Sequence, residues 1–174
     1  LRGRTQAGPW RGWQPFQSAK SSWFHRIERT HGMILRGFDV DATDGTPEMV
    51  AKANEQYGVD ARVMRFDELM ADDDYDAVWA NACLLHVGRS DLPTLLTAIR
   101  RALRPCGWHF ASYKLGNGEG RDLLGRLHNF PDPQWLEDSY RNVGFAIEGV
   151  EIFPGQGADG TPRDWMALTT RRPS

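Results

Sequence analysis

The sequence contains little cysteine and no long apolar run. Its 174 residues include two cysteines, Cys83 and Cys106, which are too few for a disulfide framework and suit a reducing compartment. No run approaches the roughly 18 apolar residues of a membrane-spanning helix, and no signal-peptide pattern opens the chain. The net charge of −2 gives no reason to expect nucleic acid or an anionic membrane as a partner. We therefore expect one cytoplasmic globular domain, long enough to bury a core.

The first 36 residues lack features that the rest of the chain has. They contain no glycine between Gly12 and Gly32 and no acidic residue before Glu28, yet they hold three of the seven tryptophans. A basic amphipathic arm that touches a membrane or a partner would need a helical apolar pattern, which this segment does not show. We predict that residues 1–36 form an atypical, poorly ordered N-terminal segment.

The most informative stretch present in the chain is GFDVDATDGTPEM, residues 37–49. Apolar and polar residues alternate as far as Thr43, which is the period of a strand. Asp44-Gly45 then predicts a turn, and Thr46-Pro47 predicts the start of a helix. Ligands of open α/β sheets bind outside the carboxyl ends of the strands. Asp44 is therefore well placed to accept hydrogen bonds from two ribose hydroxyls.

The remaining chain continues to alternate between strand and helix patterns. Apolar residues from Leu92 to Leu103 follow one helical face, with Ser90 or Asp91 as the cap and Pro105 as the stop. The loop PGQGADGTP is too short for a crossover helix, so the last two strands are expected to form an antiparallel hairpin. A short helix-like piece is expected at Leu123, Leu124 and Leu127. The strands are expected at residues 61–66, 77–80, 108–113, 145–153 and 165–170, and a further helix at 132–143.

These elements predict an α/β fold. The expected architecture is a doubly wound, mostly parallel, Rossmann-like sheet with helices on both faces, closed by the C-terminal antiparallel hairpin. We find no internal repeat and no second domain in the sequence.

Five segments in order resemble one protein family. They are FDVDATDGTPEM, RVMRFDEL, YDAVWANACLLHV, LLTAIRRALRPCGWHFASYK and WMALTTRR. With them the chain resembles a class I S-adenosylmethionine-dependent methyltransferase of the compact kind that acts on small molecules. The resemblance covers roughly residues 37–172 and implies a methyltransferase-like domain over residues 37–174.

The resemblance implies S-adenosyl-L-methionine as cofactor and a small-molecule methyl acceptor as partner. Asp44 matches the family's ribose-binding carboxylate, Met49 would pack against the adenine, and Phe66-Asp67 matches the place where the adenine edge is read. Asn81-Ala82 matches the strand end beside the methionine portion, and Leu85-His86 a segment that closes over the same pocket. The implied cofactor-binding residues are Asp44, Gly45, Thr46, Met49, Phe66, Asp67, Asn81, Ala82, Leu85 and His86.

The chemistry implied by the family requires neither a catalytic triad nor a metal. Methyl transfer from a sulfonium is an in-line displacement with a good leaving group, so positioning can supply up to roughly 7–11 kcal/mol of the acceleration. We assign no catalytic residue from the sequence. His25 and His31 lack partners for a metal site. His109, His128 and the loop Gly116–Gly120 are interpreted as structural or lid-like.

The sequence departs from the family where a glycine-rich loop is expected before Asp44. Counting back places that loop at residues 23–27, which contain no glycine. The strand before the loop is central in this fold. Either residues 14–24 form a substitute strand, or a neighbouring chain supplies one in a homodimer, or the fold is weak. A fourth explanation is that the N-terminal sequence is not the ancestral one. A smaller departure is Cys106, where the family usually has glycine, and this alters a turn.

Two other functions stay open at this stage. An acidic residue at the end of a second strand also marks the NAD ribose site of dehydrogenases, but these need G-x-G-x-x-G near residues 20–27, which is missing. The other alternative is a non-catalytic methyltransferase-like binding or scaffold protein that has lost the cofactor loop.

Overall fold

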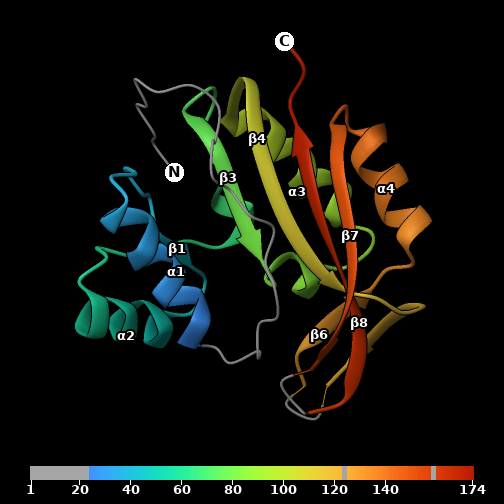
Figure 1. The fold of residues 1–174 in the computed structure, drawn as a ribbon, viewed down its shortest axis with the longest axis horizontal. Helices are drawn as coiled ribbons and strands as arrows, with labels where there is room; N and C mark the ends of the chain where they lie inside the picture. The colour runs from blue at the N-terminus through green and yellow to red at the C-terminus, as the bar shows by residue number, and fades with distance from the viewer. Residues whose placement is uncertain (1–23, 123–124, 158–159) are drawn as a thin grey trace.

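The computed structural model describes residues 24–122, 125–157 and 160–174, which form an α/β arrangement around a central sheet (Figure 1). Two 3-10 helices, η1 (Phe66–Glu68) and η2 (Leu84–His86), follow strands β2 (Arg62–Val63) and β3 (Tyr75–Asn81). The elements in chain order are α1 (Phe24–Leu35), β1 (Thr43–Asp44), α2 (Pro47–Tyr57), β2 (Arg62–Val63), η1 (Phe66–Glu68), β3 (Tyr75–Asn81), η2 (Leu84–His86), α3 (Leu92–Ala102), β4 (Leu103–Lys114), β5 (Gly118–Arg121), β6 (Leu127–Phe130), α4 (Pro133–Asn142), β7 (Ala146–Gln156) and β8 (Pro162–Arg171).

The central sheet has four strands in the order β3-β4-β8-β7. β3 and β4 are parallel, with Asn81 opposite Ser112, whereas β8 is antiparallel to both of its neighbours, β4 and β7. The sheet is therefore mixed. The four strands expected at residues 77–80, 108–113, 145–153 and 165–170 lie almost entirely within β3, β4, β7 and β8.

A second, smaller sheet pairs β1 with β2 in parallel. Each of its strands has two residues, so the strands expected before Asp44 and over residues 61–66 are much shorter than predicted. Among the described residues, no strand joins this pair to β3. The two parts are connected instead by Asp41, whose carboxylate accepts a hydrogen bond from the Tyr75 hydroxyl at 2.5 Å and is paired with Arg62 at 2.9 Å.

Helix α1 lies within the N-terminal segment, residues 1–36, that we expect to be atypical and poorly ordered. Phe24–Leu35 are helical, and the character of the segment as a whole stays a prediction. The helix lies against α2, where His31 contacts the ring of Tyr57 at 5.8 Å between centroids. Contact with α2 can stabilise this helix, because tertiary packing supplies most of the stability of helices in proteins. Residues 1–23, including the proposed substitute strand before Phe24, lie outside the described residues.

The main core lies between the central sheet and helices α3 and α4. The predicted apolar face of α3 is confirmed, since Leu92, Leu95, Leu96 and Ile99 are buried. Helix α4 begins as predicted at Asp132, whose side chain accepts a hydrogen bond from the Trp135 N–H at 2.9 Å. The described helices α3 and α4 contact each other, and the placing of helices on both faces of the sheet stays a prediction.

The segment after β4 is a hairpin rather than the expected short helix. β5 and β6 are antiparallel, with Leu127 opposite Arg121. Local hydrogen bonds explain the difference: the Arg126 N–H donates to the Asp122 side chain, and Gly125 adopts φ +75, which favours glycine. The predicted positions Leu123 and Leu124 lie outside the described residues.

Within the described residues, no helix is both long and apolar enough to cross a bilayer.

Candidate functional site

Asp44 is the last residue of β1, and one of its two carboxylate oxygens accepts a hydrogen bond. Its Oδ1 accepts a hydrogen bond from the Thr46 N–H at 2.9 Å, and its backbone carbonyl accepts one from the Met64 N–H at 3.0 Å. Within the part of the chain that the structure describes, Asp44 Oδ2 has no hydrogen-bond partner. The turn fixes a half-buried carboxylate at the end of a parallel strand, with one oxygen open to a ligand.

The residues after Asp44 lead directly from the end of β1 into α2. Gly45 and Thr46 are exposed, and Met49 is half-buried in the first turn of α2. Thr46 is the N-cap residue of α2, as predicted, although its side chain makes no capping hydrogen bond.

Phe66 and Asp67 lie in η1, directly after the neighbouring strand β2. Phe66 is 42% exposed, which is unusual for a large apolar ring. Both carboxylate oxygens of Asp67 are hydrogen-bonded by Arg65, at 3.0 and 2.5 Å, and this lowers the pKa of Asp67. The pair is well exposed, so exchanging it for a ligand has a small energetic effect.

Asn81 and Ala82 leave β3 in a geometry held by β4. The Ser112 hydroxyl donates to Asn81 Oδ1 at 2.8 Å and accepts from the Ala82 N–H at 2.9 Å. Ala82 has φ +51, a left-handed backbone conformation that side chains disfavour. Such strain is often found at functional sites, where the surrounding structure holds it in place.

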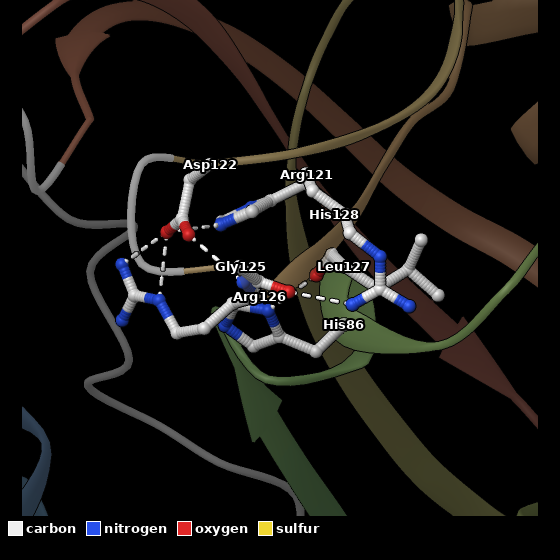
Figure 2. Close-up of polar contacts among 7 residues, drawn as sticks. All are labelled: His86, Arg121, Asp122, Gly125, Arg126, Leu127 and His128. Carbon is white, nitrogen blue, oxygen red and sulfur yellow. Dashed lines mark hydrogen bonds and ion pairs between the residues drawn. The ribbon is translucent and has the colours of Figure 1, made fainter.

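Leu85 and His86 follow in η2. Leu85 is 1% exposed and belongs to the core. His86 is partly exposed, and its Nδ1 is 2.8 Å from the Leu127 carbonyl of β6, as Figure 2 shows. The ring of His86 also contacts that of His128 edge-on, at 4.5 Å between centroids.

The predicted site residues thus form two groups. One lies where β1 and β2 end, and the other where β3 ends. The hydrogen bonds given above stay within each group and its neighbouring strand or hairpin. Sequence reasoning missed the contact of His128 with His86, because it depends on how the β5–β6 hairpin folds back, and no spacing in the sequence signals that.

A metal centre finds no support among the described residues. No group of three or more His, Cys, Asp or Glu side chains there has a geometry that could hold a metal ion.

The protein family that matches this chain and the similar solved structures given below are methyltransferases. Residues 28–107 match a protein family described as "Methyltransferase domain". No curated protein matches the chain.

Among solved structures, a similar one is an S-adenosylmethionine-dependent methyltransferase from Methanosarcina mazei, with TM-score 0.71, 13% identity, and coverage of 85% of this chain and 86% of that one. Another is the Burkholderia thailandensis 1,6-didemethyltoxoflavin N1-methyltransferase, solved with 1,6-didemethyltoxoflavin and S-adenosylhomocysteine, with TM-score 0.67 and 21% identity, covering 83% of this chain and 66% of that one.

A third is the Haemonchus contortus phosphoethanolamine N-methyltransferase 2, solved with phosphomonomethylethanolamine and S-adenosylhomocysteine. Its TM-score is 0.64 at 14% identity, with coverage of 85% of this chain and 47% of that one, so this chain spans less than half of that protein.

These identities show a shared fold, and the family match adds a relationship in sequence over residues 28–107. Residues 28–107 thus resemble a methyltransferase domain in sequence, and the chain has the fold of S-adenosylmethionine-dependent methyltransferases, with a carboxylate at the end of β1 and an ordered end of β3.

Proposed function

We propose that this protein transfers a methyl group from S-adenosyl-L-methionine to a small-molecule acceptor. The observation that carries the proposal is the open Oδ2 of Asp44 at the end of a parallel strand. A carboxylate oxygen in that position can accept a hydrogen bond from a ribose hydroxyl.

The residues at the strand ends suit the ribose, the adenine and the methionine portion of the cofactor. Asp44, with Gly45 and Thr46, would hold the ribose, while Met49, Phe66 and Asp67 would surround the adenine. The exposure of Phe66 fits a ring that a ligand covers. Asn81, Ala82, Leu85 and His86 would lie along the methionine portion.

One region departs from the family's pattern. The place of the expected glycine-rich loop falls largely on the start of α1, whose backbone is helical from Phe24. The chain therefore has to bind the cofactor mainly through the ends of β1, β2 and β3. This predicts weaker binding than a complete glycine loop would give, because fewer backbone N–H groups approach the ligand.

The cofactor would supply an activated methyl group on a sulfonium. The chain's own task is then to hold the acceptor in line with that methyl group and to exclude water. The apolar residue Leu85 and the fixed backbone at Ala82 suit this positioning role.

A small-molecule acceptor is supported by the ligands of two similar structures, 1,6-didemethyltoxoflavin and phosphomonomethylethanolamine. We also propose that residues 37–174 form the methyltransferase unit. Its sheet would be doubly wound and closed by β7 and β8, which pair antiparallel.

Isothermal titration calorimetry with S-adenosylmethionine, S-adenosylhomocysteine and NAD tests the proposal. We expect binding of the first two ligands and not of NAD. The substitution Asp44→Ala should weaken binding about 10- to 100-fold, because a hydrogen bond to a charged group contributes roughly 1.5–3 kcal/mol.

A matched control is Asp72→Ala, which removes an exposed carboxylate from a loop outside the site and should leave the affinity unchanged. If none of the three ligands binds, the proposal of an enzyme is refuted and a non-catalytic binding or scaffold protein is favoured. Binding of NAD alone would favour a dehydrogenase.

A further inference from the structure

Two histidine rings meet at the carboxyl end of β3, and each is fixed by a hydrogen-bond acceptor (Figure 2). His86 from η2 lies against Leu127, and His128 from β6 lies against Asp122, which starts the hairpin turn. The rings contact each other edge to face, with centroids 4.5 Å apart. His86 is one of the proposed cofactor-binding residues, so His128 borders the proposed site directly.

The acceptors determine which nitrogen of each ring carries a proton. The Leu127 carbonyl can only accept, so Nδ1 of His86 must donate to it across 2.8 Å. An ionised Asp122 can likewise only accept, so Nε2 of His128 must donate to Oδ2 across 3.2 Å. In a neutral His128 ring, Nδ1 is then the unprotonated, basic nitrogen.

Nδ1 of His128 is buried and, among residues 24–122, 125–157 and 160–174, it has no hydrogen-bond partner. The residue is 3% exposed. Leaving a buried acceptor without a hydrogen-bond donor destabilises the folded state. A ligand that presents an N–H or O–H group to Nδ1 would supply such a donor.

The groups around His128 keep the ring neutral and Asp122 ionised. Arg126 holds Asp122 through its Nε at 2.7 Å, its terminal nitrogen at 2.6 Å and its backbone N–H at 2.9 Å. Burial lowers the pKa of His128, Asp122 raises it, and the positive charges of Lys114 and Arg126 lower it. The net direction is down, so His128 is unprotonated at pH 7. The other neighbours are His86 and the ring of Phe130, which stacks on His128 at 5.4 Å.

We propose that His128 is the general base of the methyl acceptor, oriented by Asp122, and that the acceptor is a small compound whose reacting nitrogen or oxygen carries a hydrogen. This inference rests on the proposed function. It assigns the acceptor side of the site to the β5–β6 hairpin, whereas the cofactor side is assigned to the strand ends.

The step balances as follows in atoms and electrons. The acceptor's N–H or O–H bond breaks, its proton passes to Nδ1 of His128, and its electron pair stays on the acceptor atom. That pair forms the new bond to the methyl carbon, as the methyl–sulfur bond of the S-adenosylmethionine cosubstrate breaks with its electrons left on sulfur. The imidazolium formed faces the Asp122 carboxylate and later returns its proton to solvent.

Nitrogen NMR of protein labelled with ¹⁵N-histidine tests the assignment directly. Phenol, imidazole and uracil serve as probes, because each presents an O–H or N–H group on a small ring. We expect Nε2 of His128 to carry the proton in the resting protein. At least one probe should shift the Nδ1 resonance, while buried His109 stays unchanged as an internal reference.

The proposal is overturned if Nδ1 carries the proton, or if all three probes leave its resonance unmoved. The same samples test the proposed function separately, since S-adenosylhomocysteine should shift the amide signals of Ala82 and Leu85. Absence of those shifts counts against the cofactor site, however His128 behaves.

Kinetics provide a second test, using transfer of labelled methyl from S-adenosylmethionine to the probe that binds. His128→Gln keeps a donor for Asp122 but has no basic nitrogen, so the rate should fall about 10²- to 10⁴-fold with the affinity for S-adenosylhomocysteine unchanged. His31→Gln changes a histidine on α1 and should leave the rate as it is. Equal rates in wild type and His128→Gln would refute the role.

Two further variants distinguish a role of His128 as a base from a purely structural role. They do so even if His128→Gln fails to fold. Asp122→Asn removes a carboxylate that raises the pKa of His128, so the pKa should fall. Lys114→Met removes a positive charge that lowers this pKa, so the pKa should rise. The pH below which the transfer rate falls should move with that pKa in each variant. A pH profile that stays in place while the pKa moves would contradict the proposal.

Discussion

At the residue scale, His109 shows how a buried polar side chain is accommodated in the core. It is 1% exposed on β4, and its Nδ1 donates to the Val78 carbonyl at 3.0 Å. Its Nε2 must therefore accept from the Tyr140 hydroxyl at 3.1 Å, and Tyr140 in turn accepts from Tyr113 at 2.9 Å. Every donor in this chain of hydrogen bonds has an acceptor, which is what a buried polar network requires.

The network makes stability depend on pH. Burial lowers the pKa of His109 to about 4, from 6.5 in an exposed histidine. Between about pH 4 and pH 6.5, the unfolded chain therefore binds a proton at His109 that the folded chain does not bind. The contribution of His109 to the free energy of unfolding is thus fully present above about pH 6.5 and decreases as the pH falls towards 4. The loss from this group amounts to roughly 3 kcal/mol. Urea unfolding of the wild type at several pH values measures it.

The control is His109→Gln, whose amide can donate to Val78 and accept from Tyr140 but does not titrate in this range. The difference in unfolding free energy between wild type and variant should shrink as the pH falls from 7 to 4. Parallel curves for the two proteins would contradict the assignment.

At the element scale, the junction of α3 and β4 contains a bulge. Tyr75 of β3 pairs with Leu103, but Ala77 pairs with Trp108, so two steps on one strand face five on the other. The extra residues of β4 turn sharply. A Cβ on Gly107 would lie 2.8 Å from the Arg104 carbonyl, and Cys106 has φ +64. Cysteine thus occupies a backbone conformation that favours glycine, at the position where the sequence departs from the family that it resembles.

We expect Cys106→Gly to stabilise the protein by about 0.5–1 kcal/mol. A left-handed conformation disfavours a side chain by about 1–2 kcal/mol, and the extra freedom of glycine in the unfolded chain offsets part of that gain. Chemical denaturation compares it with Cys106→Ala, which keeps a Cβ and should be neutral. Equal stability of the glycine and alanine variants would show that the turn is not strained.

At the scale of the whole molecule, the described residues form three sheets, and two of them, the β1–β2 pair and the central sheet, share few direct links. The β1–β2 pair carries Asp44, whereas the central sheet carries Asn81, Ala82 and His86. A ligand that touches both strand ends would connect parts that share only a few side-chain contacts, such as the Tyr75–Asp41 hydrogen bond. Its binding energy would add to the stability of the assembled fold.

We therefore expect S-adenosylhomocysteine, at about a hundred times its Kd, to stabilise the protein by about 2.7 kcal/mol. For a chain of this length the midpoint of thermal unfolding should rise by about 5–10 °C. Asp44→Ala at the same ligand concentration should show a smaller rise, because its affinity is lower. An unchanged midpoint in the wild type would count against a site at the strand ends.

Sequence patterns predicted the elements whose information is local. The apolar face of α3, the cap at Asp132, the turn at Asp44 and the strands of the central sheet follow from period, capping and turn chemistry. These features depend on residues within one or two turns of each other, so the sequence alone carries them.

The tertiary structure decided what depends on distant partners. Helix α1 packs against α2. The β5–β6 hairpin occurs where a short helix was expected, because Asp122 and Gly125 belong to its turn. The contact of His86 with His128 joins residues 42 positions apart. No local pattern encodes such a contact, because the two rings meet, and His128 is buried, only when the hairpin packs against η2. The sequence alone predicted the strands of the central sheet and the turn at Asp44, and folding determined which side chains meet at the strand ends.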